Sequence, residues 1–87
     1  MKKIFQEKTI TKNNKTAIAS FEAKTLFYLG WSILVRLSVN GRVVYENSKL
    51  ILSEREWRYE QKYDEFHISI TYSNLVFGDE TIEFKIT

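Results

Sequence analysis

Apolar and polar residues alternate along most of this chain with a period of two, and this pattern restricts the fold more than any other sequence feature. Successive side chains of a β-strand point to opposite faces, so alternation gives a strand with one buried and one solvated face. The sequence also lacks proline, which interrupts the ladder of a sheet. An all-β fold is therefore predicted. In the clearest strand the apolar positions are Ile33, Val35, Leu37 and Val39, with Leu34 the only apolar residue on the second face.

The dipeptide Asn40-Gly41 follows that strand and predicts a tight hairpin. A type I′ turn needs positive φ at both central residues, and Asn-Gly adopts it readily. The returning strand is predicted at residues 42–47. A two-residue loop would place Val44 opposite Leu37 on the core face.

Two further strands are predicted at residues 57–63 and 66–72, on either side of Asp64-Glu65. A two-residue loop there brings the aromatic and aliphatic positions of both strands onto one face. Because the turn contains no glycine, a four-residue type I loop is the alternative. The two-residue loop predicts the pairs Tyr63–Phe66, Tyr59–Ile70 and Trp57–Tyr72.

The last strand is predicted at residues 81–87, with three apolar residues on its buried face. A three-residue loop at residues 78–80 would set Tyr72 opposite Ile86. A two-residue loop would instead require a bulge near Ser73-Asn74 to keep the apolar residues on one face.

The N-terminal segment is predicted to add two strands. Residues 3–11 form an edge strand with Phe5 and Ile10 turned inward, followed by a turn at Lys12-Asn13-Asn14-Lys15. Residues 16–24 alternate as a strand, although an alanine-rich helical turn is the alternative. The inward residues of this strand are predicted to be Ala17, Ala19, Phe21 and Ala23, and a further short strand is predicted at residues 49–52.

Seven or eight short strands separated by turn signals are typical of a small sandwich or barrel. We predict a single domain, residues 1–87, folded as a small antiparallel β-sandwich built from consecutive hairpins. Each hairpin has one apolar face, which needs a second sheet to cover it. A small OB-like β-barrel is the second choice, since the helix that such barrels usually contain is missing here.

Lysine is concentrated at the N-terminal end of the chain. Five lysines and one glutamate occupy the first 15 residues, whereas the remaining residues carry eight basic and ten acidic side chains. Lysines on an exposed edge strand discourage pairing with other chains, and we favour this interpretation over an arm that binds a polyanion. Nucleic acid is therefore not the expected partner.

The sequence predicts a cytoplasmic protein without a membrane segment. Polar residues interrupt any export signal in the N-terminal segment, and the longest apolar stretch, residues 26–35, is about half of what a bilayer requires. The absence of cysteine fits a reducing compartment. A composition rich in Lys, Asn, Ile, Glu and Tyr indicates an AT-rich coding sequence of bacterial or phage origin.

Catalysis is not expected, since the chain lacks the residues that most reactions need. His67 is the single histidine and there is no cysteine, so a zinc site and most nucleophile–base pairs have no candidates. Glu54, Glu56, Glu60 and the acidic residues of the turns are predicted to be solvated, which argues against an acid–base pair. We predict no enzyme activity, catalytic residue, metal or cofactor.

Function is predicted to lie in a binding surface, because two Trp, five Tyr and six Phe are many for so small a core. A strand with one buried face could not bury every side chain of the apolar run around Gly30, so either some of them are exposed or the run crosses between the sheets and is buried on both sides. Rigid aromatic residues exposed there would form an interaction hot spot. The candidates for contact with a partner are Phe27, Tyr28, Trp31, Trp57 and Tyr59.

The first function class predicted is a non-enzymatic protein–protein interaction module that uses a sheet edge or an aromatic patch. One form is a small phage or mobile-element protein that binds and inhibits a host protein, of the anti-CRISPR or another anti-defence type. A homodimer is another form. The alternatives are a domain that binds single-stranded nucleic acid by stacking bases on aromatic rings, or one that binds carbohydrate.

Overall fold

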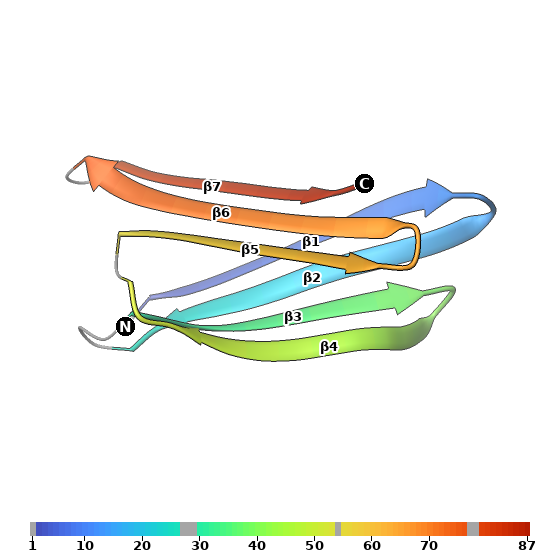
Figure 1. Cartoon of the computed structure of the whole chain (residues 1–87), viewed down its shortest axis with the longest axis horizontal. Coiled ribbons are helices and arrows are strands. Elements are labelled where there is room, and N and C mark those ends of the chain that lie inside the picture. The colour runs from blue at the N-terminus through green and yellow to red at the C-terminus, as the bar shows by residue number, and fades with distance from the viewer. Residues whose placement is uncertain (1, 27–29, 54, 77–78) are drawn as a thin grey trace.

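The computed structural model describes residues 2–26, 30–53, 55–76 and 79–87, which form seven antiparallel strands in two sheets (Figure 1). The four-stranded sheet has the order β1-β2-β3-β4, and the three-stranded sheet has the order β5-β6-β7. The strands are β1 (Lys3–Lys12), β2 (Lys15–Thr25), β3 (Trp31–Val39), β4 (Arg42–Ile51), β5 (Glu56–Tyr63), β6 (Phe66–Val76) and β7 (Asp79–Ile86).

The predicted all-β sandwich of consecutive hairpins is confirmed. The separate strand predicted at residues 49–52 is instead the end of β4, and β2 is a strand without a helical turn. No described strand of one sheet pairs with a strand of the other, so the sheets do not close into the OB-like barrel.

The turns between the strands use residues that tolerate positive φ. Asn13 and Asn14 have φ of 52° and 65°, and Asn40 and Gly41 have φ of 52° and 83°, as type I′ turns require. Asp64 has φ of 53° in the β5–β6 loop. A short polar side chain allows this conformation, so the predicted two-residue loop forms there without glycine.

The inner faces of the two sheets share one core. The alanines of β2 leave room for the larger rings of the opposite sheet, and Phe21 meets Phe84 edge to face with centroids 5.0 Å apart. The buried residues of the four-stranded sheet are Ala17, Ala19, Phe21, Ala23, Trp31, Ile33, Val35 and Leu37. Those of the three-stranded sheet are Trp57, Tyr59, Phe66, Ile68, Ile70, Tyr72 and Phe84.

A β-bulge makes the predicted register of β3 with β4 wrong beyond the turn. Ser38 pairs with Val43 as a two-residue loop requires, but Leu37 then pairs with Tyr45, so Val44 is the extra residue. Both Val44 and Tyr45 pack against the core. The bulge therefore brings a tyrosine inward that simple alternation places on the outer face.

The register of β5 with β6 is confirmed, including Tyr59 opposite Ile70 and Trp57 opposite Tyr72. In the β6–β7 hairpin the three-residue loop is wrong, because Tyr72 lies opposite Ile82 and not Ile86. The register shifts between Ser73 and Val76, close to the bulge that the alternative loop required.

β1 is an edge strand, as predicted, but Phe5 points away from the core and is 59% exposed. Ile4 and Ile10 pack against the core instead. In a regular strand residues 5 and 10 point to opposite faces, so both could not turn inward. The face that carries two isoleucines is the buried one.

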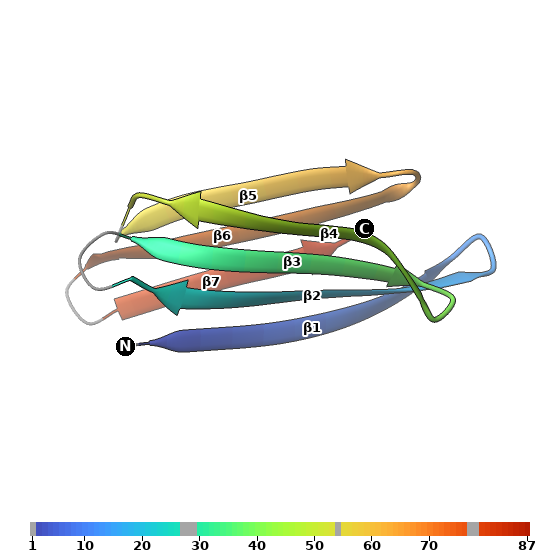
Figure 2. The ribbon, with the colours of Figure 1, turned by 90° about the horizontal axis from the view of Figure 1, so that it is seen from below.

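The two sheets are offset sideways, so that one strand forms each lateral border. In Figure 2, β5 lies beyond β4 at one border and β1 lies beyond β7 at the other. The Tyr45 and Tyr59 hydroxyls lie 2.6 Å apart on the β4/β5 flank. On the opposite flank the Lys8 ammonium lies 5.8 Å from the Phe84 ring centroid.

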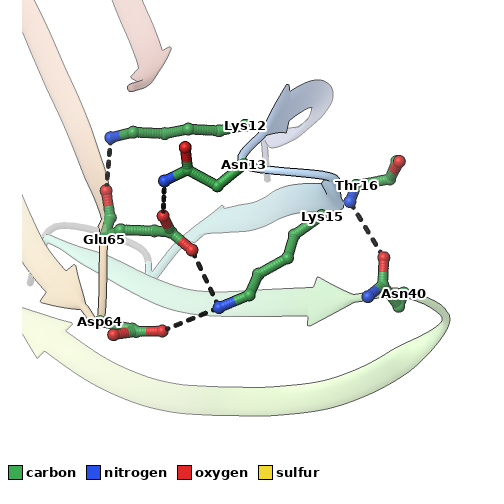
Figure 3. A network of polar contacts seen from close by, with 7 residues as sticks. All are labelled: Lys12, Asn13, Lys15, Thr16, Asn40, Asp64 and Glu65. Atoms are coloured by element: carbon green, nitrogen blue, oxygen red, sulfur yellow. Dashed lines mark hydrogen bonds and ion pairs between the residues drawn. The ribbon is translucent and has the colours of Figure 1, made fainter.

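Contacts between the β1–β2 and β5–β6 turns hold the sheets together at one end (Figure 3). The Glu65 carboxylate accepts a hydrogen bond from the Asn13 amide and lies 3.0 Å from Lys15 Nζ. Its backbone carbonyl accepts a hydrogen bond from Lys12 Nζ at 2.7 Å. The Asn13 hydrogen bond, followed by Lys15, lowers the pKa of Glu65.

Candidate functional site

Trp31, Trp57 and Tyr72 form an aromatic cluster inside the sandwich. The centroids of Trp31 and Tyr72 are 4.8 Å apart, and Trp57 stacks on Tyr72 at 5.5 Å. Trp31 is only 2% exposed and Trp57 5%. The exposure predicted for Trp31 is therefore wrong. In this fold Trp31 and Trp57 are core residues that cannot reach a partner.

Gly30 explains why Trp31 turns inward. A Cβ atom at Gly30 would lie 2.0 Å from the carbonyl oxygen of Ile51, and φ of Gly30 is +124°. The chain thus packs directly against the end of β4, where Trp31 pairs with Ile51. Trp31 is the first residue of β3, so its side chain takes the inward direction of that strand's buried row.

Tyr59 is also buried, and its hydroxyl belongs to a polar network on the β4/β5 flank. It meets the Tyr45 hydroxyl and accepts a hydrogen bond from the Asn47 amide at 3.3 Å. Burial, together with the Tyr45 hydrogen bond, raises the pKa of Tyr59 to about 12. Neither Tyr59 nor Trp57 offers an open ring for stacking a base or a sugar.

Phe27 and Tyr28 lie outside the described residues, so their role in binding stays a prediction. A hollow of about 240 Å³ lies at the end of the sandwich beside Gly30. Its polar groups already contact one another: Lys2 bonds to the Glu80 carboxylate, and the Tyr72 hydroxyl donates to Glu80 at 3.2 Å. Burial, and then the charge of Glu80, raises the pKa of Tyr72.

The outer face of the three-stranded sheet carries only polar and charged side chains along the rows that the structure describes. Signs alternate on β5, and β6 contributes mostly small hydroxyl groups. Such a face is well solvated. Its residues are Glu56, Arg58, Glu60 and Lys62 on β5, His67, Ser69, Thr71 and Ser73 on β6, and Thr81, Glu83 and Lys85 on β7.

The outer face of the four-stranded sheet is different, because apolar side chains lie on all four of its strands. Phe5 on β1 and Val43 and Leu50 on β4 are more than half exposed, at 59%, 53% and 56%. Between them, Ile18 and Leu34 are half-buried. Exposed apolar groups gathered on one face are typical of an interaction surface.

Charges on this same face neutralise one another. Glu22 lies 3.2 Å from Lys24 Nζ and 3.6 Å from Lys3 Nζ, and the hydrogen bond from Lys24 lowers the pKa of Glu22. Arg36 donates to Glu46 through Nε at 2.7 Å and approaches it through Nη2 at 2.6 Å. A partner would therefore meet apolar side chains interspersed with charges that are already paired, on a face with little net charge.

A shallow hollow of about 200 Å³ lies in this outer face around Leu34. The pairing explains it: Leu34 lies opposite Ser48, and the neighbouring Ser32 lies opposite Leu50. Short serine side chains therefore stand beside longer apolar ones. The hollow is lined by Glu22, Lys24, Ser32, Leu34 and Ser48.

Every lysine of the first 15 residues meets a partner within its own chain. This supports the edge-protection interpretation over a free basic arm, since Lys8 points inward from an edge strand. The partners are Glu80 for Lys2, Glu22 for Lys3, the Phe84 ring for Lys8, the Glu65 carbonyl for Lys12, and Asp64 with Glu65 for Lys15.

In the described part of the chain, no three acidic or histidine side chains gather as a metal ion would require. Those residues also contain no helix of the length and apolarity needed to cross a membrane. Comparison with known proteins found no matching protein family, curated protein or solved structure. The surface chemistry of this fold is therefore the basis for a functional assignment.

Sequence reasoning did not select the outer face of the four-stranded sheet, although one signal of it was visible. Leu34 is the only apolar residue on the polar side of its strand. Single apolar residues are common on surfaces, so Leu34 alone carried no prediction. Only the strand pairing brings it next to the rows that hold Phe5 and Leu50.

Proposed function

We propose that this protein is a non-enzymatic module that binds another protein through the outer face of the four-stranded sheet, along β3 and β4. One observation carries this proposal: three of the large apolar side chains that are exposed among the described residues lie on this face, whereas Tyr63 at the end of β5 is opposite the buried Phe66. Phe5, Val43 and Leu50 lie on this face, and Leu52, 75% exposed, follows β4. The described rows of the other outer face carry none.

The side chains on this face indicate which kind of protein surface it would bind. Leu34 and Leu50 would bury apolar side chains of the partner, and desolvating such groups is the main source of affinity in protein interfaces. Ser32 and Ser48 offer hydroxyl groups at the rim of the hollow around Leu34. Because Arg36 is already paired with Glu46, the partner needs no compensating charge at that point.

Such a module acts by covering a surface of its partner, so it needs no catalytic group. Inhibition of a host protein by this means is the form of activity that we propose, and it is consistent with the small size of the chain. The contact surface that we propose is a sheet face with mainly aliphatic residues, whereas the sequence indicated a sheet edge or an aromatic patch.

The test compares substitutions at the centres of the two outer faces. Tagged wild-type protein, Leu34→Lys and Leu50→Lys are used to capture partners from an extract of the source cell, with Thr71→Lys as the matched control on the other face. We expect each leucine variant to retain at least about tenfold less partner, because a charge enters the apolar contact. Thr71→Lys should capture as much as wild type.

All variants should melt within a few degrees of wild type, since the substituted side chains are outside the core. If Leu34→Lys and Leu50→Lys are folded and still capture the same partner at the wild-type level, the proposed face is wrong. Loss of capture by Thr71→Lys alone would move the binding surface to the three-stranded sheet.

A further inference from the structure

We propose that a second copy of this chain binds along the free edge of β5, so that the two three-stranded sheets join into one continuous sheet. The surface involved is the lateral border formed by β5 in Figure 2, where β5 extends beyond β4. It is separate from the outer face of the four-stranded sheet. The dimer and the proposed partner binding are therefore tested independently.

The backbone of β5 has unused hydrogen-bonding groups on the side away from β6. His67 and Thr87 exchange both backbone hydrogen bonds, at 2.8 and 2.9 Å. The backbone groups of odd-numbered residues in this part of β6 therefore point to β7, and those of even-numbered residues point to β5. On the β5 side, the Asn74 amide donates to the Arg55 carbonyl at 2.6 Å. Odd-numbered residues of β5 thus bond to β6, and the backbone groups of Arg58 and Glu60 point outward.

The charged side chains of β5 also have no partner among the residues that the structure describes. All four are exposed, and none of them takes part in the ion pairs or side-chain hydrogen bonds found among the described residues. Elsewhere most exposed charges are paired, as in Glu22 with Lys24 and Arg36 with Glu46. The four charged residues are Glu56, Arg58, Glu60 and Lys62.

The order of these charges is complementary to itself when the strand is reversed. In an antiparallel pair centred on Tyr59, Arg58 lies opposite Glu60 of the second copy, and Glu56 lies opposite Lys62. The twofold axis repeats both contacts, so every charged residue of β5 faces an opposite charge. Opposite charges directly across two antiparallel strands stabilise the pair, and like charges destabilise it.

The registers shifted by two residues are repulsive, so the charges favour this alignment over its neighbours. Shifting the second copy by two residues in one direction sets Arg58 opposite Arg58 and Glu56 opposite Glu60. The opposite shift sets Glu60 opposite Glu60 and Arg58 opposite Lys62. A shift by one residue turns the outer face of one copy to the inner face of the other.

The backbone hydrogen bonds between the two copies would form at the centre of the paired β5 strands. Arg58 and Glu60 of both copies are free to form them, whereas the Glu56 amide already donates to Ser53 Oγ at 3.3 Å. The Lys62 carbonyl likewise accepts a hydrogen bond from Gln61 at 2.7 Å. The interface is thus short, and we expect a dimer that dissociates on dilution.

Sedimentation equilibrium of the full chain, from about 10 μM to about 1 mM at low salt, tests this proposal. Wild type should approach the dimer mass as concentration rises. Arg58→Glu sets like charges opposite each other at both Arg58–Glu60 contacts and should weaken the dimer at least about tenfold. Glu60→Arg should have the same effect.

The double variant Arg58→Glu/Glu60→Arg restores opposite charges in reversed order and should recover most of the wild-type dimerisation. Lys85→Glu, an exposed charge change on β7, serves as the matched control and should leave the dimer unchanged. Thermal melting checks that each variant is folded. A wild-type chain that stays monomeric at the highest concentration overturns the proposal, as does a folded double variant that fails to recover.

Discussion

The two sheets share one core and differ in the side chains that they present on their outer faces. The three-stranded sheet turns its large aromatic side chains inward, including Trp57 and Tyr72, and carries polar and charged residues on its outer face. The four-stranded sheet buries three alanines and leaves Phe5 and Leu50 exposed. A count of aromatic residues therefore indicates where the core lies, while a few aliphatic side chains mark the surface available for binding.

The number of strands accounts for part of this difference. Three strands must cover the inner face of four, so each inward residue of the smaller sheet has to fill more volume. Small residues such as Ala19 on β2 leave space for the rings opposite, as Phe84 packing beside Phe21 shows. The larger sheet therefore also has apolar residues, such as Phe5 and Leu50, that are not part of the core.

The largest effect is expected when an aromatic core residue is removed. Trp31→Ala should destabilise the protein by about 3–5 kcal/mol, because it leaves a cavity beside the stacked rings of Trp57 and Tyr72. Urea unfolding followed by circular dichroism measures this. Leu50→Ala, an exposed position, should change the unfolding free energy by less than about 0.5 kcal/mol. If Trp31→Ala melts like wild type, Trp31 is not a core residue.

A smaller effect is expected when a residue of β2 is enlarged, and it should depend on the face. Ala19→Leu should cost about 1–3 kcal/mol, because Ala19 is fully buried against the opposite sheet. Ser20→Leu, one residue along on the outer face, should be close to neutral. Equal costs at both positions would contradict the assignment of inner and outer faces to β2.

Between the sheets, Tyr59→Phe should cost about 1 kcal/mol, since it removes the hydrogen bonds to Tyr45 and Asn47. The raised pKa of Tyr59 also predicts a pH dependence. The neutral phenol is favoured in the folded state, so this stabilisation is present below the ordinary pKa of 10.0 and is lost as pH rises towards about 12. Urea midpoints between these pH values should fall for wild type more than for Tyr59→Phe.

The smallest effect is expected at the contact between the two turns. Glu65→Gln should lower the melting temperature slightly at neutral pH, because Lys15 loses the nearer of its two ionic partners and keeps only Asp64. The pKa of Glu65 is lowered, so its contribution is present above the ordinary value of 4.5 and disappears as pH falls below it. Melting curves of both proteins should converge in acid and in high salt. A difference that persists in acid would contradict this origin.

The elements of the fold could be predicted because local signals agreed with one another. Alternation identified the strands, and Asn40-Gly41 and Asp64-Glu65 located two of the turns. The inward alanines of β2 followed from the same alternation. These features depend on residues close together in sequence, where propensity and side-chain period act directly.

The errors arose where the outcome depended on contacts between distant residues. The bulge at Val44 inserts a residue without any mark in the pattern, and near Ser73 the pattern left a three-residue loop and a bulge as alternatives. The burial of Trp31 depends on Gly30 packing against Ile51, some 20 residues further on. The binding face likewise appeared only after pairing had brought Leu34 and Leu50 onto neighbouring rows.

The contrast between the two outer faces can be tested most directly by site-specific photo-cross-linking in the source cell. A photoreactive amino acid replaces Leu34 in one version of the protein and Thr71 in another, each on an inner strand of its sheet. We expect a cross-linked complex with a second protein from position 34 and none from position 71. Equal cross-linking from both positions, or cross-linking from position 71 alone, would contradict this expectation.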